Sequence, residues 1–189
     1  MARLKILSAD DFDNLYTIPK IEKQDREFLF ELDEYDNKYL NTLTDLSSKL
    51  DYILQMEYFR ISQYFFNFTI HGVKQDSWYI IETYYPDSKF PKKTTSKHYV
   101  YQNRKAILKK YEMFSYNSSF RKKLETYAKD LARQHIAPKY IFDSLLDFCH
   151  QNRFVRPSYS VLQEIISEAL NNERNRLSNK LYRLMDKPF

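Results

Sequence analysis

The stretch that decides the fold is RFVRPSYSVLQEIISEAL, which occupies residues 153–170. The apolar side chains of this stretch recur at intervals of three and four residues: Leu162, Ile165, Ile166 and Ala169. Such a period is typical of an amphipathic helix that buries one face. The same pattern continues through Leu177, Leu181 and Leu184, so the sequence predicts one long helix over about residues 158–185.

The entrance to this helix carries two arginines and several hydroxyl groups. Arg153 and Arg156 precede it, and the first predicted turn contains Ser158, Tyr159, Ser160 and Gln163. Ser160 and Gln163 have the spacing of a capping box. A helix N-terminus presents unpaired N–H groups and the positive end of the dipole, which suit a phosphate oxygen. A plain loop-to-helix junction with solvated arginines is the alternative.

The whole chain is predicted to be all-α. It has 189 residues but a single glycine, where average usage would give roughly a dozen. So little glycine argues against tight β-hairpins and against a Gly-rich phosphate loop. Gly72 itself is expected in a left-handed cap or a turn, and the type of segment 78–84 stays open. Apolar stripes predict the other helices at about residues 8–16, 22–32, 35–43, 45–64, 98–111, 118–135 and 138–148.

Charge and proline usage predict two small helical bundles. Residues 1–90 carry 10 Lys+Arg and 16 Asp+Glu, a balance of −6, whereas residues 91–189 carry 20 and 9, a balance of +11. The change falls in the proline- and serine-containing stretch 86–96. We therefore expect a helix-turn-helix-like module at 1–88, a linker at 89–97 and a basic helix-turn-helix-like module at 98–189. So basic a second module favours a polyanionic partner.

Several other classes of protein receive no support from the sequence. Cys149, the single cysteine, lies in an apolar pattern and is interpreted as a core residue, which also fits a reducing compartment. No signal peptide or membrane span is evident, so we expect a soluble, cytoplasmic protein. The four histidines are widely separated, and no nucleophile, metal or nucleotide motif is present. We expect no cofactor, no metal and no enzymatic activity.

Two segments resemble the N-terminal region of Tn-three family transposases, the replicative, cointegrate-forming bacterial enzymes. Residues 156–169, RPSYSVLQEIISEA, are similar to the family segment P-x-x-S-T-L-E-R-L-x-x-E-A. Residues 50–60, LDYILQMEYFR, are similar to the earlier segment L-G-F-A-L-Q-L-x-x-L-R, with Asp51 in place of its glycine. The order and separation of the two segments also match, so the resemblance covers about residues 5–185. The family's H-R-A-E-I segment corresponds to Asn103–Ile107 here.

This resemblance implies a function and a set of residues. In that family an N-terminal helical part binds the terminal inverted repeats of the transposon, and a catalytic acidic triad lies in a C-terminal part that this chain does not contain. We therefore expect an N-terminal transposase portion that binds double-stranded DNA without catalysis. Its expected DNA contacts are Arg153, Arg156, Ser158, Tyr159, Ser160, Gln163, Lys97, Arg104, Lys105 and Arg60. Its expected core and helix anchors are Leu50, Leu54, Met56, Phe59, Leu162, Ile165 and Ala169, with Gln55 as a buried polar tie.

One alternative belongs to a different class of function. The chain would then be a helical interaction module for transposase self-association, and its basic half would meet an acidic surface of another copy. A homodimer formed through the full-length transposase would be the corresponding partner. An RNA-binding protein is a third alternative, but no recognised RNA-binding module is present.

Overall fold

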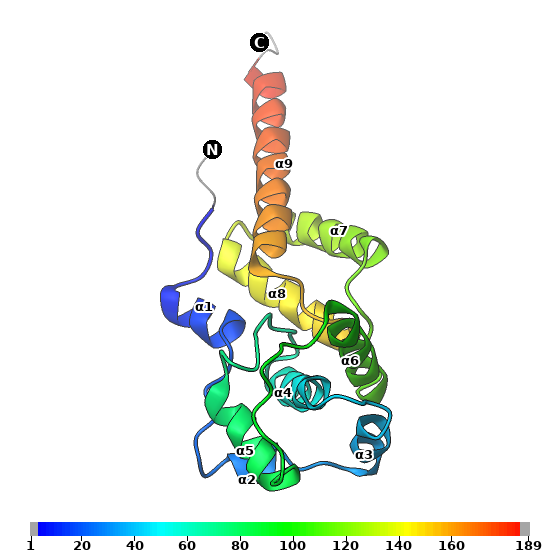
Figure 1. Ribbon diagram of the computed structural model, residues 1–189. Coiled ribbons are helices and arrows are strands. Elements are labelled where there is room, and N and C mark those ends of the chain that lie inside the picture. Colours follow the sequence, from blue (N-terminus) through cyan, green and yellow to red (C-terminus); the bar gives the residue numbers. More distant parts are fainter. Residues whose placement is uncertain (1–3, 186–189) are drawn as a thin grey trace. The chain divides into compact units, whose positions relative to one another are not determined.

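The computed structural model describes residues 4–185, and all regular elements in this range are helical (Figure 1). A single isolated bridge, between Phe114 and Phe154, is the only β-type pairing described there. The predicted all-α class is confirmed. The helices are α1 (Ala9–Tyr16), α2 (Arg26–Leu29), α3 (Glu34–Leu40), α4 (Leu46–Ser62), α5 (Lys74–Tyr84), α6 (Lys97–Lys110), α7 (Ser118–Gln134), α8 (Pro138–Gln151) and α9 (Tyr159–Met185).

The chain divides into two compact units, which we describe separately. The N-terminal unit comprises residues 14–113 and holds helices α2 to α6. The C-terminal unit comprises the described residues 4–13 together with 114–185, and holds helices α7, α8 and α9. Helix α1 begins in the C-terminal unit and ends in the N-terminal unit.

This division differs from the expected modules, because the predicted linker 89–97 lies inside the N-terminal unit. The basic helix α6, which follows that stretch, packs along α4. Three residues of α6 are buried: Asn103, Ala106 and Ile107. The burial of this face fixes α6 to the N-terminal unit. The change in net charge along the sequence therefore does not mark the boundary between the units.

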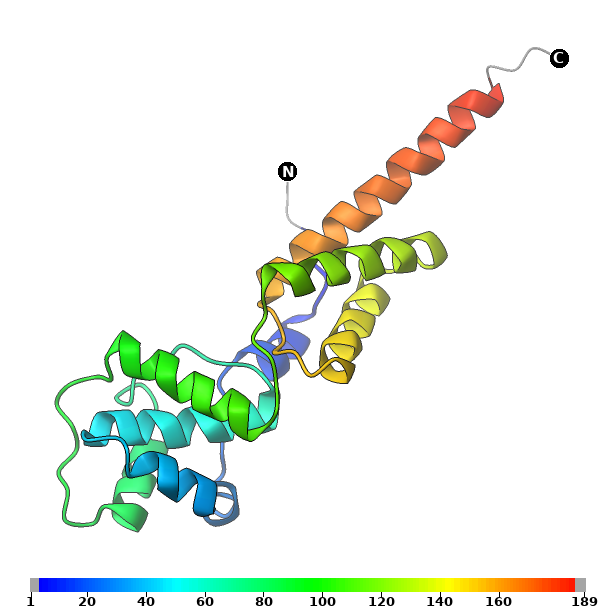
Figure 2. The same cartoon turned by 90° about the vertical axis from the view of Figure 1, so that its right-hand side faces the viewer.

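Helix α4 is the central element of the N-terminal unit, and α3, α5 and α6 lie around it (Figures 1 and 2). Asp45 caps its first turn, since its carboxylate accepts the backbone N–H of Ser48 at 2.9 Å. Side chains on all sides of α4 are buried, including Leu50, Tyr52, Ile53, Leu54, Met56, Tyr58 and Phe59. A helix that is apolar and buried all round is typical of a core element. The predicted core positions of this segment are therefore confirmed.

The left-handed cap lies at a different residue from the predicted one. Gln63 ends α4 with a φ of 53°, whereas Gly72 does not have a positive φ. Of the two alternatives for Gly72, the turn is the one that forms: its N–H donates to the carbonyl of Thr69 at 2.9 Å. The segment 78–84, whose type the sequence left open, belongs to helix α5.

The predicted helix over residues 22–32 is mostly absent, because only Arg26–Leu29 is helical there. The side chain of Arg26 turns toward another element, and its Nε lies 2.9 Å from a carboxylate oxygen of Asp76 on α5. Asp33 then adopts an extended backbone and opens α3 through a capping box with Asp36. The side chains of Arg26 and Asp33 thus bond to partners outside a continuous 22–32 helix, and such side-chain bonds compete with helix formation.

A set of buried polar contacts joins α3, α4 and α6. Asp36, which is fully buried, accepts hydrogen bonds from the Tyr52 hydroxyl at 2.8 Å and from Lys110 Nζ at 2.5 Å. Asn103 of α6 donates to a carboxylate oxygen of Asp51 on α4 at 2.8 Å. Buried polar groups need such partners to offset the loss of water. Removing any one of the three helices would therefore leave a buried polar side chain of another helix without its hydrogen-bond partner.

The C-terminal unit contains three helices that pack against one another in pairs. Asn117 caps α7 by accepting the N–H of Phe120 at 2.9 Å, and Pro138 opens α8. The buried faces of these helices are Phe120, Leu124, Ala128 and Leu131 on α7, and Ile141, Phe142, Leu145 and Cys149 on α8. The interpretation of Cys149 as a core residue is therefore confirmed.

Helix α9 extends past the helices that it packs against, as Figure 2 shows. Its first half is anchored by Leu162, Ile165, Ile166 and Ala169, all of which are buried as predicted. Further along, the apolar stripe has no cover within the described part of the chain. Leu177, Leu181 and Leu184 are 43%, 61% and 59% exposed. The stripe is thus core in the first half of the helix and surface in the second.

Candidate nucleic-acid interface

The predicted capping box at the start of α9 does not form. The helix begins at Tyr159, so Ser160 lies within its first turn and cannot be the cap. The backbone carbonyl of Ser158 accepts the N–H groups of Val161 and Leu162 at 3.0 and 3.2 Å, which makes Ser158 the last residue before the helix. The hydroxyl groups of Ser158 and Ser160 lie 3.0 Å apart.

Two of the residues predicted to contact DNA at this helix entrance hold the N-terminal segment instead. The Tyr159 hydroxyl accepts the backbone N–H groups of Ile6 at 3.0 Å and Leu7 at 3.4 Å. Gln163 Nε2 donates to the carbonyl of Leu4 at 2.5 Å. The Tyr159 ring also packs edge-on against Phe12, with the ring centres 5.5 Å apart. Tyr159 and Gln163 are therefore half-buried, since the segment before α1 covers that side of α9.

The two arginines before α9 differ in their surroundings. Arg153 has an exposed side chain and a left-handed φ of 55°, and its carbonyl accepts the N–H of Phe114 at 2.7 Å. Arg156 is half-buried. Burial raises the pKa of the Cys149 thiol to about 12, and the positive charge of Arg156 opposes this rise only in part. Of the predicted residues in this region, Arg153 and Ser160 are exposed, whereas Arg156, Ser158, Tyr159 and Gln163 are half-buried.

Arg60 and Arg104 are engaged within the N-terminal unit. Arg104 Nη2 donates to the carbonyl of Phe66 at 2.7 Å, and burial lowers the pKa of its guanidinium. Arg60 Nη2 donates to the carbonyl of Leu29 at 2.9 Å and lies 2.8 Å from the carboxylate of Glu57. Both arginines join segments that are distant in the sequence. A phosphate would have to compete with these contacts.

The remaining predicted lysines belong to an exposed stripe along α6. Lys97 and Lys105 are exposed, and the residues between and beyond them at the same spacing are Tyr101 and Lys109. Side chains four residues apart lie on one face of a helix. We call Lys97, Tyr101, Lys105 and Lys109 the basic stripe. Tyr101 is 65% exposed, and none of the three lysines forms an ion pair within residues 4–185.

The segment of sequence that carries the basic stripe has charges of a single sign. The sequence contains no Asp or Glu between Asp87 and Glu112. The neighbouring Lys110 does not share the exposed face, because it is bound to Asp36 at 2.5 Å and Asp33 at 3.0 Å. Burial alone would lower the pKa of Lys110, but the hydrogen bonds to these carboxylates raise it. Tyr101 was predicted from the sequence as a possible phosphate contact, whereas Lys109 was not, although its four-residue spacing from Lys105 is visible in the sequence.

Two further properties concern metal binding and membrane insertion. Among the described residues, no group of three or more His, Cys, Asp or Glu side chains is arranged to hold a metal ion. None of the helices within residues 4–185 combines the length and the apolar character that crossing a bilayer requires.

These features define a helical protein of two units in which helix α6 has an exposed basic face. The chain belongs to the family described as Domain of unknown function (DUF4158), whose profile matches residues 6–169. The matched range contains α1 to α8, the basic stripe and the first part of α9. No match to the chain was found among curated proteins.

Proposed function

We propose that this chain binds double-stranded DNA as the N-terminal part of a transposase, at the terminal inverted repeats of the transposon. The observation that carries the proposal is the basic stripe, in which three exposed lysines line one face of α6. Lysines that neutralise phosphates supply most of the non-specific affinity of a DNA-binding protein. Tyr101 adds a hydroxyl that can donate to a phosphate oxygen.

The resemblance to Tn-three family transposases supports the inverted-repeat target. Both similar segments lie inside the range that the family profile matches, 6–169. Residues that the resemblance implies as core are buried in both segments: Leu50, Leu54, Met56 and Phe59 in α4, and Leu162, Ile165 and Ala169 in α9. Gln55 is the implied buried polar tie, and its Nε2 donates to the carbonyl of Phe66 at 3.0 Å.

The three-helix packing of α7, α8 and α9 supports a helix-turn-helix-like role for the C-terminal unit. The connection between α8 and α9 spans residues 152–158, which is longer than the turn of three to four residues usual in that motif. We therefore propose that the C-terminal unit binds DNA as a three-helix module whose α8–α9 connection differs from the usual helix-turn-helix turn. Within this unit we assign Arg153, Ser158 and Ser160 to further phosphate contacts.

Replacing the stripe lysines tests the proposal. The variant Lys97→Ala/Lys105→Ala/Lys109→Ala should weaken binding to duplexes of every sequence. Because three phosphate contacts are lost, the log–log salt dependence of the affinity should flatten by roughly two to three units. Fluorescence anisotropy with a labelled duplex of mixed sequence, titrated between about 50 and 200 mM salt, measures both quantities.

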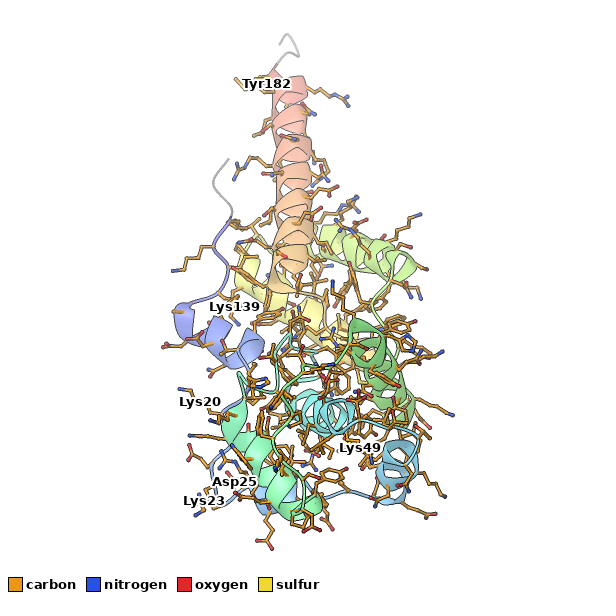
Figure 3. All side chains as sticks on the ribbon, viewed as in Figure 1. Lys20, Lys23, Asp25, Lys49, Lys139 and Tyr182 are labelled. Carbon is orange, nitrogen blue, oxygen red and sulfur yellow. The ribbon has the colours of Figure 1, made fainter. Side chains whose placement is uncertain are left out.

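A matched control distinguishes the loss of contacts at the basic stripe from a general loss of positive charge. Lys20, Lys23 and Lys74 are equally exposed, and they line a different surface depression of about 600 Å³ that also contains Glu22 and Asp76. Figure 3 shows Lys20 and Lys23 extending outward from the N-terminal unit. The triple alanine variant of these lysines removes the same charge but should leave affinity and salt dependence nearly unchanged. Equal losses in both variants would contradict a contact at the stripe.

A protein-interaction module is the second candidate, and the exposed leucines of α9 favour it. Leu177, Leu181 and Leu184 form an apolar stripe that another helix would cover. Sedimentation velocity over a range of concentrations measures self-association of the chain. A dimer that dissociates in the Leu177→Gln/Leu181→Gln variant would support this role.

A further inference from the structure

Two of the side chains predicted to read bases at the entrance to α9 are engaged within the protein. Gln163 is bound to the carbonyl of Leu4, and the Tyr159 hydroxyl is bound to the N–H groups of Ile6 and Leu7. Neither side chain is free to read the edge of a base. A surface elsewhere must therefore distinguish one sequence from another if binding is specific.

The second half of α9 carries such a surface. Asn172, Asn175, Asn179 and Arg183 follow one another at intervals of three and four residues, which places them along one face of the helix. All four are exposed, and the side-chain amides of the asparagines make no hydrogen bond within residues 4–185. We call these four residues the asparagine stripe. Tyr182 lies beside its end, near the tip of α9 in Figure 3.

The chemistry of the asparagine stripe matches base edges. Asn can form two hydrogen bonds with adenine and Arg can form two with guanine, and the major groove of B-DNA admits an α-helix. The four residues extend over roughly 16 Å of helix axis at a rise of 1.5 Å per residue. That length corresponds to about five base pairs at 3.4 Å each.

Charge and placement favour a nucleic acid over a protein at this face. Residues 174–185 contain Arg174, Arg176, Lys180 and Arg183 but no Asp or Glu. This part of α9 also extends beyond α7 and α8 of its own unit, so a partner can approach it (Figure 2). Arg176 is held by two bonds to Glu173, at 2.6 and 2.7 Å, and is not counted among the reading residues.

We infer that the asparagine stripe reads base edges in the major groove, with Asn172, Asn175 and Asn179 as specificity-determining residues. The inference rests on the proposed DNA-binding function and adds the element that gives it sequence preference. The lysines of the basic stripe then hold phosphates, while the asparagines select the sequence. The exposed leucines lie on a different face of the same helix and take no part in the reading.

A selection from random DNA tests the inference, because such a selection does not require that the target sequence be known. The chain is incubated with a library of duplexes that carry a randomised central region, and the bound fraction is sequenced. The variant Asn172→Ala/Asn175→Ala/Asn179→Ala keeps the net charge, and alanine is the better helix former, so the helix should persist. We expect its affinity for the unselected library to stay within about twofold of the parent. Each lost pair of hydrogen bonds should lower discrimination against a wrong base by roughly 5- to 150-fold.

The matched control is Leu177→Gln/Leu181→Gln, which alters another face of the same segment and should retain the selected motif. An unchanged motif in the asparagine variant, or an equal loss in the leucine variant, would overturn the inference.

If the chain binds the library but selects no motif, the inference fails while DNA contact through the basic stripe stands. If the chain binds no duplex, both proposals fail. A dimer that the asparagine variant abolishes would assign this face to a protein partner and also overturn the inference.

Discussion

Glu57 lies near the middle of α4 with only 1% of its surface exposed. Burial raises the pKa of its carboxyl from 4.5 to about 7, and the positive charges of Arg60 and Lys110 offset only part of this rise. A carboxyl whose pKa is higher in the folded state binds its proton more tightly there. Its contribution to stability is therefore fully present below about pH 4.5 and is lost as the pH rises through about 7.

Replacing this carboxyl by an amide should remove the pH dependence. At pH 8, Glu57→Gln should raise the free energy of unfolding by at most about 3 kcal/mol, and the gain should nearly vanish at about pH 4. Urea unfolding at both pH values measures the difference. Glu34→Gln is the control, because Glu34 is exposed and pairs only with Lys38 at the surface. A gain of equal size at both pH values would show that ionisation of Glu57 is not its cause.

Tyr159 offers a second test at the scale of one residue. Tyr159→Phe keeps the ring against Phe12 but removes the hydroxyl that accepts from Ile6 and Leu7. We expect a loss of about 1 kcal/mol in the free energy of unfolding, with DNA affinity and salt dependence unchanged. Arg153→Ala should instead lower the salt slope by about one unit, because one phosphate contact is lost. Weaker DNA binding by a fully stable Tyr159→Phe would restore the role that the sequence predicted for it.

The structural role of a single residue could be predicted from the sequence only where its bonding partner lies nearby in the chain or where it belongs to a periodic apolar pattern. Gln55 is surrounded by core residues of its own helix, so its burial could be anticipated, and its acceptor on Phe66 lies 11 residues away. Gln163 bonds to Leu4, 159 residues distant. No pattern along the chain indicates such a contact, because it depends on how the N-terminal segment folds back in its unit.

Among the elements, α9 combines a packed half and an unpacked half. A helix in water without tertiary contacts is only marginally stable, so its backbone hydrogen bonds open often. We expect amides from about Leu162 to Glu173 to exchange slowly with deuterium, and amides from Leu177 to Met185 to exchange much faster. Hydrogen exchange followed by mass spectrometry of overlapping peptides measures both. Slow exchange in both halves would indicate a partner on the second half, and dilution would show whether that partner is another copy.

The helices themselves were largely predictable, since most begin at a capping residue and follow a regular apolar period. Asp45, Ser96 and Asn117 each accept a backbone N–H of the helix that follows. The exceptions have physical causes. The predicted helix at 22–32 shrinks to Arg26–Leu29 because side-chain contacts with α5 and the cap of α3 compete with it. The apolar stripe of α9 predicted burial along its whole length, but amphipathic spacing does not reveal how far the neighbouring helices reach.

At the scale of the whole molecule, net charge suggested a boundary that packing does not follow. The change of sign near residues 86–96 led to the expected modules, yet helix α6 belongs with residues 14–113. Its exposed face carries the lysines of the basic stripe, while its buried face carries Asn103, Ala106 and Ile107. The net charge of a helix is determined mainly by its exposed residues, so it does not indicate which core the buried face of that helix packs into. The proposed DNA contact and the core of the N-terminal unit therefore share one helix.

Because α6 contributes to the core of the N-terminal unit, we can predict which shortened proteins should still fold. A protein of residues 14–113 should unfold cooperatively, because it keeps every helix from α2 to α6. A protein of residues 1–88 should not, since removing α6 leaves the buried Asp51 without the hydrogen bond from Asn103 and Asp36 without Lys110. Unpaired buried carboxylates each cost several kcal/mol, and the apolar surface of α4 would be open to water as well. Circular dichroism during urea titration compares the two proteins. Cooperative unfolding of 1–88 would mean that α6 is dispensable for the N-terminal unit, and would place the boundary at the linker that the charge pattern suggested.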